Sequence, residues 1–250
     1  MSKIRVLAVA SDSHGVGKFR IIDPYTFLGI NFTTDVHVDI SYDVADTDDQ
    51  FDNYQIVVFH SFIHKTTHER NVERIKWLKT KGITVIMDID DLWFVDKRHP
   101  MYDAIKFHKI GEKKIEMMKL VDHITTTTSI FAKTIKEKLG LKNVIVFPNA
   151  VDETETQFVS NPTTSDKIRF GWLGGSSHLS DIELLKNGIS STFHSHRDKV
   201  QFVLCGFDLR GQITEIDVNT GQQRQRQIQP LETVWYKYEQ IFTDNYTSLD

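Results

Sequence analysis

Short apolar runs alternate with longer amphipathic segments along the first 147 residues of the chain. The runs are rich in Val and Ile and have the length of β-strands, and they cover residues 4–10, 35–40, 54–60, 83–87, 122–127 and 143–147. Strands that are spaced by helices are typical of a parallel sheet covered on both faces. The pattern therefore predicts an α/β fold in which all strands end at one edge, where such sheets collect their ligands.

The helices between these strands are marked by apolar periodicity and by capping residues. They are expected from Lys18, over residues 64–81, over residues 102–120 and from Ser129, which is a candidate N-cap. Gly82 and Gly140 stand where helix C-caps are expected. Pro24 is expected to kink or restart the first helix, because proline cannot donate a helical hydrogen bond.

A polar stretch separates this first unit from a second one. Residues 151–166 lack apolar periodicity, which is typical of a linker between domains 1–150 and 167–250. The second domain is expected to contain strands over 168–173 and 200–205, a helix from His178 to about Ser190, a long Gln-rich loop over 210–229, and a helix or strand over 231–242. Since this leaves room for only two or three strands, we expect the second domain to be incomplete.

The composition is that of an ordinary globular protein, with 40% hydrophobic and 26% charged residues. A net charge of -4 gives no reason to expect a nucleic-acid partner. The single cysteine, Cys205, excludes an intrachain disulfide, which fits a reducing compartment. The apolar run at the start is shorter than a signal peptide requires, and no segment approaches the roughly 20 apolar residues of a membrane span. The sequence predicts a cytoplasmic protein.

The first candidate site is the loop between the first strand and the first helix, Ser11-Asp12-Ser13-His14-Gly15-Val16-Gly17-Lys18. Glycines let a backbone pass close to a ligand, and a helix N-terminus offers free N–H groups to an anion. The loop has the spacing of neither a Walker A motif nor a full dinucleotide-binding fingerprint. A tight turn without a ligand is the alternative interpretation.

Polar residues also follow the third and fourth strands. His60 ends one strand and is a candidate acid, base or hydrogen-bond donor, although a loop histidine without function would look the same. Asp88, Asp90 and Asp91 follow the other strand. Like charges this close must be solvated, hydrogen-bonded or neutralised by a cation. They are therefore candidates for holding the hydroxyls of a sugar acceptor, for orienting His60, for binding a metal–nucleotide, or for capping the next helix.

A second junction of strand, glycine loop and helix lies in the second unit, at Phe170-Gly171-Trp172-Leu173-Gly174-Gly175-Ser176-Ser177-His178. Backbone amides in such a loop suit a diphosphate. The helix expected over 102–120 is rich in lysine and is a candidate for contact with an anionic membrane surface. Glu112 and Glu116 interleave with those lysines, which favours a solvated face instead.

Three of these segments resemble the retaining, GT-B-fold glycosyltransferases of the glycosyltransferase 4 type. They are the Gly loop at residues 13–17, the segment Val144-Ile145-Val146-Phe147-Pro148-Asn149-Ala150-Val151-Asp152, and the strand and loop at 168–175. The inter-domain segment around Pro148-Asn149 is the most specific match. The Arg and Lys that this family carries after the strand at 168–173 have no counterpart before Lys186, and its C-terminal Glu motif has none before Asp250.

The resemblance implies a GT-B-like architecture of two Rossmann-like domains, the second incomplete, and transfer of a sugar from a nucleotide diphosphate donor to an unidentified glycan, lipid or protein acceptor without a metal cofactor. It implies a catalytic group of His60, Asp90 and Asp91. Donor contacts are expected from Gly15, Gly17, Gly171, Gly174, Gly175, Ser176 and His178. Acceptor-side contacts are expected from His14, Lys18 and Asp88. The alternatives are a non-catalytic carbohydrate- or protein-binding module and a metal-dependent phosphotransferase that uses Asp88 and Asp90.

Overall fold

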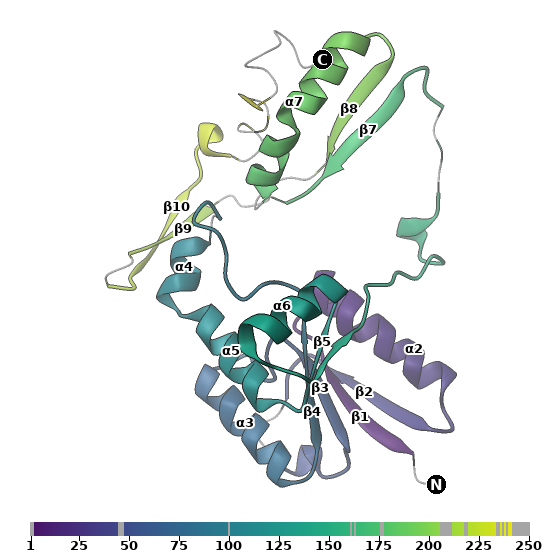
Figure 1. Cartoon of the computed structure of the whole chain (residues 1–250), viewed down its shortest axis with the longest axis vertical. Helices are drawn as coiled ribbons and strands as arrows, with labels where there is room; N and C mark the ends of the chain where they lie inside the picture. Colours follow the sequence, from purple (N-terminus) through teal and green to yellow (C-terminus); the bar gives the residue numbers. More distant parts are fainter. Residues whose placement is uncertain are drawn as a thin grey trace. The chain divides into compact units, whose positions relative to one another are not determined.

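The computed structural model divides into two compact units (Figure 1). Unit 1 comprises residues 1–94 and 109–159, and unit 2 comprises residues 95–108 and 160–250. The structure describes residues 3–44, 48–99, 101–160, 162, 164–175, 178–205, 212–217, 220–233, 236, 238, 240 and 241. Among these residues, no helix combines the length and the apolar character that crossing a membrane requires.

In its described residues, unit 1 is built on a six-stranded parallel sheet with the strand order β2-β1-β3-β4-β5-β6. The strands are β1 (Ile4–Val9), β2 (Val36–Ser41), β3 (Ile56–His60), β4 (Thr84–Ile89), β5 (His123–Thr126) and β6 (Val144–Val146). The predicted α/β class and the six predicted strands are confirmed, and the sheet is Rossmann-like.

The core explains why the strands could be recognised as short apolar runs. Val57, Val58 and Phe59 of the central strand β3 are all fully buried, because helices cover both faces of the sheet. One cluster joins the sheet to α3, α5 and α6. A smaller cluster on the other face contains Ile21 and, at its border, Tyr25.

The helices of unit 1 begin and end close to the predicted caps. They are α1 (Gly15–Gly17), a π-helical turn (Lys18–Ile22), α2 (Asp23–Asn31), α3 (His68–Thr80), α5 (Ile110–Leu120) and α6 (Ser129–Leu139), with short 3-10 turns at Asp48–Phe51 and Thr156–Phe158. Gly82 and Gly140 follow α3 and α6 with φ angles of 74° and 69°, as the C-cap prediction requires. The N-cap of α6 is Thr128 and not Ser129, since the Thr128 hydroxyl accepts the N–H of Phe131 at 3.1 Å.

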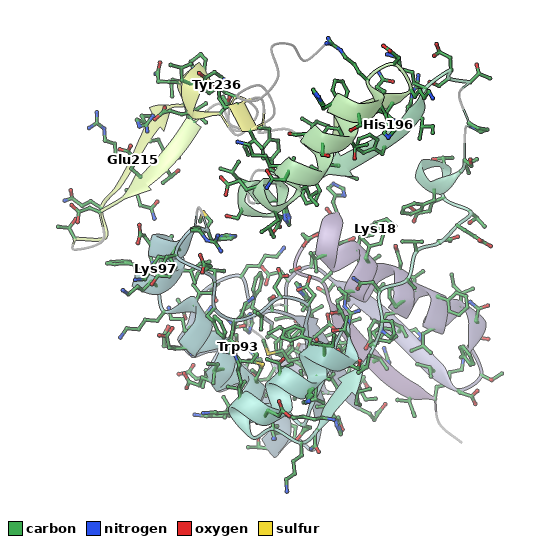
Figure 2. All side chains as sticks on the ribbon, turned by 45° about the horizontal axis from the view of Figure 1, so that its top comes forward. Lys18, Trp93, Lys97, His196, Glu215 and Tyr236 are labelled. Carbon is green, nitrogen blue, oxygen red and sulfur yellow. The ribbon has the colours of Figure 1, made fainter. Side chains whose placement is uncertain are left out.

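The single helix predicted over residues 102–120 is wrong. The chain forms α4 (Tyr102–Phe107) and α5, separated at Lys109, whose φ of 51° is left-handed. Gly111, in the first turn of α5, packs closely on the backbone before α4, because a Cβ there would lie 2.2 Å from the carbonyl oxygen of Trp93, a residue labelled in Figure 2. This close packing fixes α5 to unit 1, whereas α4 belongs to unit 2, so the chain passes between units at Lys109.

Unit 2 contains a parallel β-α-β element made of β7 (Ile168–Leu173), α7 (Leu179–His196) and β8 (Val200–Cys205). The helix continues beyond the predicted end at Ser190, whose side chain is buried. Ile182, Tyr238 and Ile241 form its small core. That this unit is an incomplete second Rossmann-like domain stays a prediction.

The long loop predicted over residues 210–229 is also wrong. Its described residues form an antiparallel hairpin of β9 (Gln212–Ile216) and β10 (Gln223–Gln227), followed by a 3-10 turn at Pro230–Glu232. Polar contacts stabilise it: Arg226 of β10 contacts Glu215 of β9 at 2.6 Å and Glu232 of the following turn at 2.7 Å. Such a hairpin carries no apolar alternation, and Gly221, with φ 71° at the turn, was its one local signal.

Candidate functional site

The carboxyl ends of β1, β3 and β4 bring four polar side chains into one hydrogen-bonded chain. The Ser11 hydroxyl lies 2.7 Å from Nδ1 of His60 and 2.8 Å from a carboxylate oxygen of Asp12. On the other side of the ring, Nε2 of His60 lies 2.9 Å from Asp90. The order along this chain is Asp12, Ser11, His60, Asp90, and we call it the edge relay.

The edge relay contains three contacts and therefore needs three protons. A neutral imidazole and a hydroxyl supply only two. All three contacts are satisfied when the His60 ring carries protons on both nitrogens, donates to Asp90 and to Ser11, and lets the Ser11 hydroxyl donate to Asp12.

Burial differs along the relay in a way that suits binding. The His60 side chain is 7% exposed and Asp90 is 18% exposed, whereas Asp12 and Asp91 are open to solvent. The ring is thus held inside the protein, Asp90 at one end of the relay is partly buried, and Asp12 at the other end is exposed. A ligand that reaches this edge meets carboxylate acceptors that the buried His60 ring and Ser11 hold in position.

The geometry argues against Ser11 as a nucleophile, although serine, histidine and aspartate stand in contact. The Asp12 carboxylate lies 2.8 Å from the Ser11 hydroxyl, and a negative charge at that distance opposes formation of an alkoxide. Serine therefore serves as a link between the ring and Asp12. The relay orients groups and does not activate a hydroxyl for covalent catalysis.

Asp90 has a perturbed acidity that follows from its surroundings. Burial pushes the pKa of its carboxyl up, but the hydrogen bond and charge of His60, a backbone N–H and the charge of Lys114 together bring that pKa below its ordinary value of 3.8. Because the pKa is lower in the folded state than in the unfolded one, ionised Asp90 stabilises the fold. That contribution is complete well above pH 4 and is lost as the pH falls through the lowered pKa.

The variant Asp90→Asn is expected to be less stable than the unchanged chain at moderate pH. This difference in stability should become smaller in acid. Its free energy of unfolding should lie below that of the unchanged chain at pH 5.5, and the difference should shrink as the pH is lowered to 3, because Asp90 then becomes protonated in the unchanged chain also. Urea unfolding at both pH values measures the difference. A deficit that is constant or grows toward pH 3 contradicts the assigned role of the His60–Asp90 contact.

Backbone strain marks the same edge. Ser61, directly after His60, has a φ of 64°, which is unusual for a residue other than glycine, asparagine or aspartate. Its N–H lies 3.3 Å from the Asp88 carbonyl, and its hydroxyl lies 3.5 Å from Nε2 of His60. Strained positions of this kind cluster at functional sites, so Ser61 supports the assignment of this edge as a site.

The first glycine loop is folded around Asp12. The Asp12 carboxylate accepts the N–H of His14 at 3.1 Å and that of Gly17 at 3.2 Å. Gly15 supplies a left-handed turn with φ 52°, and a Cβ at Gly17 would lie 2.3 Å from the Asp12 carbonyl oxygen. The N–H of Gly17, one of the two glycines predicted to contact a diphosphate, is thus directed at Asp12, and a diphosphate would have to displace that carboxylate to reach it. The side chain of His14 is exposed.

Asp88 has a different role from its neighbours. Its side chain is 1% exposed and forms a two-point ion pair with Arg20, with contacts of 2.9 Å and 2.6 Å. The hydroxyl of Thr125 also donates to it. This carboxylate does not face solvent, so an acceptor hydroxyl or a metal could reach it only by breaking the pair with Arg20.

Arg20 is the residue that the sequence did not reveal as part of this region. Besides Asp88, it donates to the Phe147 carbonyl and to the Asn149 side chain, the latter at 3.0 Å. It therefore fastens the end of β4 to the segment that follows β6. Lys18, labelled in Figure 2, contacts Asp23 at 2.6 Å and also Glu155, and these carboxylates, foremost that of Asp23, raise its pKa.

The glycine loop of unit 2 is shaped by close packing. A Cβ at Gly171 would lie 3.0 Å from the Val203 carbonyl oxygen, and one at Gly174 would lie 2.7 Å from the indole nitrogen of Trp172. At Gly175 a Cβ would have no atom of the described residues within 4 Å. The loop therefore offers open space at this one glycine, while Ser176 and Ser177 lie outside the described residues.

Two side chains border this loop. The carbonyl of Gly175 accepts the N–H of His178 and the hydroxyl of Tyr238, each at 3.1 Å. His178 begins α7, and its Nδ1 lies 2.7 Å from the Asp181 carboxylate. Asp181 thus holds the His178 ring at the start of the helix.

Metal-ligating side chains do not converge in the described part of the chain, where no group of three His, Cys, Asp or Glu residues has the arrangement of a metal site. The chain matches no model of a known protein family and no curated protein.

Proposed function

We propose that the chain is a glycosyltransferase of GT-B-like architecture that moves a sugar from a nucleotide diphosphate donor to an acceptor hydroxyl. The observation that supports it most is the edge relay, which stands at the carboxyl edge of a six-stranded parallel sheet, where such folds bind ligands. The resemblance of Val144–Asp152 to the inter-domain segment of that family adds the class of reaction. The single cysteine supports a cytoplasmic site of action.

The charge of the edge favours hydroxyl groups over phosphate. Asp12, Asp90 and Asp91 are acceptors of hydrogen bonds, and sugar hydroxyls are donors. Gly17 already gives its N–H to Asp12, so this edge offers few free donors to an anion. We therefore assign the acceptor to unit 1, with Asp90 and Asp91 receiving its hydroxyls.

The donor is assigned to the loop after β7 in unit 2. Backbone amides at the start of α7 and the open space at Gly175 suit a diphosphate. In the reaction, the acceptor oxygen forms a bond to the sugar carbon while the bond from that carbon to the diphosphate breaks, and the proton of the acceptor hydroxyl passes to the departing diphosphate oxygen. Rate enhancement in this scheme comes from positioning of the acceptor by Asp90, which His60 holds in place.

Isothermal titration with uridine and guanosine diphosphates and their sugar conjugates tests the proposal. Binding in the presence of EDTA is expected. The variant Gly175→Asp should weaken it at least about tenfold, because the new carboxylate enters open space beside the diphosphate. Gly188→Asp is the matched control, since a Cβ at that exposed glycine of α7 also meets nothing, and it should bind as the unchanged chain does.

Three outcomes contradict the proposal. Binding that requires Mg²⁺ would favour a metal-dependent phosphotransferase. Absence of binding for every nucleotide would favour a non-catalytic carbohydrate- or protein-binding module. Equal weakening of nucleotide binding by Gly175→Asp and Gly188→Asp would show that the donor does not bind at this loop.

A further inference from the structure

A groove outside the edge relay runs along α2 in unit 1. It lies between this helix and residues 147–155, and its volume is about 1050 Å³. That volume is at the upper limit of ordinary small-molecule pockets, which hold roughly 300–1,000 Å³. A groove of this size on a helix suits a macromolecular segment better than a single small ligand.

The floor of the groove is apolar and exposed. Phe27 and Ile30 of α2 are 63% and 67% exposed, and Val151 on the opposite wall is 58% exposed. The helix packs on β2 elsewhere, where Gly29 is close to Val38. Apolar side chains that gather along a groove mark a docking surface more often than apolar residues scattered singly.

The walls are acidic. Asp23, Asp152, Glu153 and Glu155 line the groove, and its lining contains no Lys, Arg or His. Lys18 pairs with Asp23 and Glu155. Among the salt bridges of the described residues, none involves Asp152 or Glu153. The groove therefore presents negative charge above an apolar floor.

The groove is held in shape by specific contacts, because its second wall, residues 147–155, is bonded to the rest of unit 1. Arg20 binds the Phe147 carbonyl and Asn149, and Lys18 binds Glu155. Further along, the rings of Phe158 and Phe19 lie 6.3 Å apart. Contacts at both ends hold residues 147–155 beside α2.

We propose that this groove docks a cationic amphipathic helix of a partner protein. Apolar residues of such a helix, spaced by three or four positions, would cover Phe27, Ile30 and Val151, and its Lys or Arg residues would meet the acidic walls. The acidic walls disfavour an anionic membrane as the occupant, because its surface charge has the same sign. The inference does not depend on the proposed sugar transfer.

Fluorescence anisotropy with a labelled 18-residue Leu/Lys peptide of amphipathic helical design tests this docking. We expect saturable binding that weakens as salt is raised, since exposed charges are screened. Ile30→Glu and Glu153→Lys should each weaken it about tenfold or more. Ile130→Glu is the matched control for Ile30→Glu, because Ile130 is 79% exposed on α6, away from the groove lining, and this variant should bind normally.

A Leu/Glu peptide of the same pattern provides the charge control and should not bind. Equal binding of both peptides, or equal affinity for the Ile30→Glu and Ile130→Glu variants, would overturn the proposal. Co-sedimentation with phosphatidylserine vesicles that is lost in Ile30→Glu, without peptide binding, would assign the groove to a membrane instead.

Discussion

Replacing Asp88 by Asn is expected to lower the free energy of unfolding by about 3–5 kcal/mol, the usual effect of removing one partner from a buried ion pair. Arg20 and Asp88 are 2% and 1% exposed, so neither charge can turn to water when the other is lost. The asparagine keeps the shape of the side chain, which leaves the missing charge as the main change. The Arg20 guanidinium then remains buried without a counter-charge.

Urea unfolding followed by tryptophan fluorescence measures this effect. Asp91→Asn is the matched control, since it makes the same chemical change three residues away at an exposed position, and it should stay within about 0.5 kcal/mol. The double variant Arg20→Met with Asp88→Leu should recover part of the loss, because it removes both buried charges. Equal stability of Asp88→Asn and Asp91→Asn would show that the pair contributes nothing of this size.

The sheet could be predicted from the sequence because each strand of unit 1 signals itself locally. Val57, Val58 and Phe59 are apolar since both faces of β3 are covered, and the polar residue that follows, His60, marks the edge where the strand leaves the core. A polar residue directly after a short apolar run therefore indicates, from the sequence alone, a side chain at the edge of the sheet. His60 and Asp90 were recognised in this way, and the structure brings them into contact.

Pairings between distant residues could not be predicted. Arg20 and Asp88 are separated by 68 positions, and nothing in the run Phe19–Ile22 distinguishes a buried arginine from an exposed one. Ser11 was visible only as part of a loop, because its meaning depends on the His60 ring that lies beside it. The β9–β10 hairpin was not predicted for a related reason. Its stabilising pairs are polar, whereas hydrophobic periodicity along a sequence reveals only strands with an apolar face.

His60→Ala is expected to lower kcat/KM for sugar transfer about 100-fold, and to do so mainly through kcat. In the proposed sugar transfer, His60 is a positioning residue that holds Asp90 where it would orient the acceptor hydroxyl, and a displacement of about 1 Å at such a site has an effect of this order. His60→Gln should restore part of the rate, because the amide can still donate to Asp90. Release of nucleoside diphosphate from the donor that binds in the titration provides the assay.

The comparison that separates positioning from general damage is between His60 and His37. His37 also contacts a carboxylate, that of Asp39 at 3.2 Å, but lies on the exposed surface of β2, so His37→Ala should keep the full rate. If His60 acts only through Asp90, the double variant His60→Ala with Asp90→Asn should be no slower than the worse single variant, since residues that act as one unit are not additive. Multiplied losses in the double variant would mean that the two side chains contribute separately, and the relay would then be a coincidence of packing at the edge of the sheet.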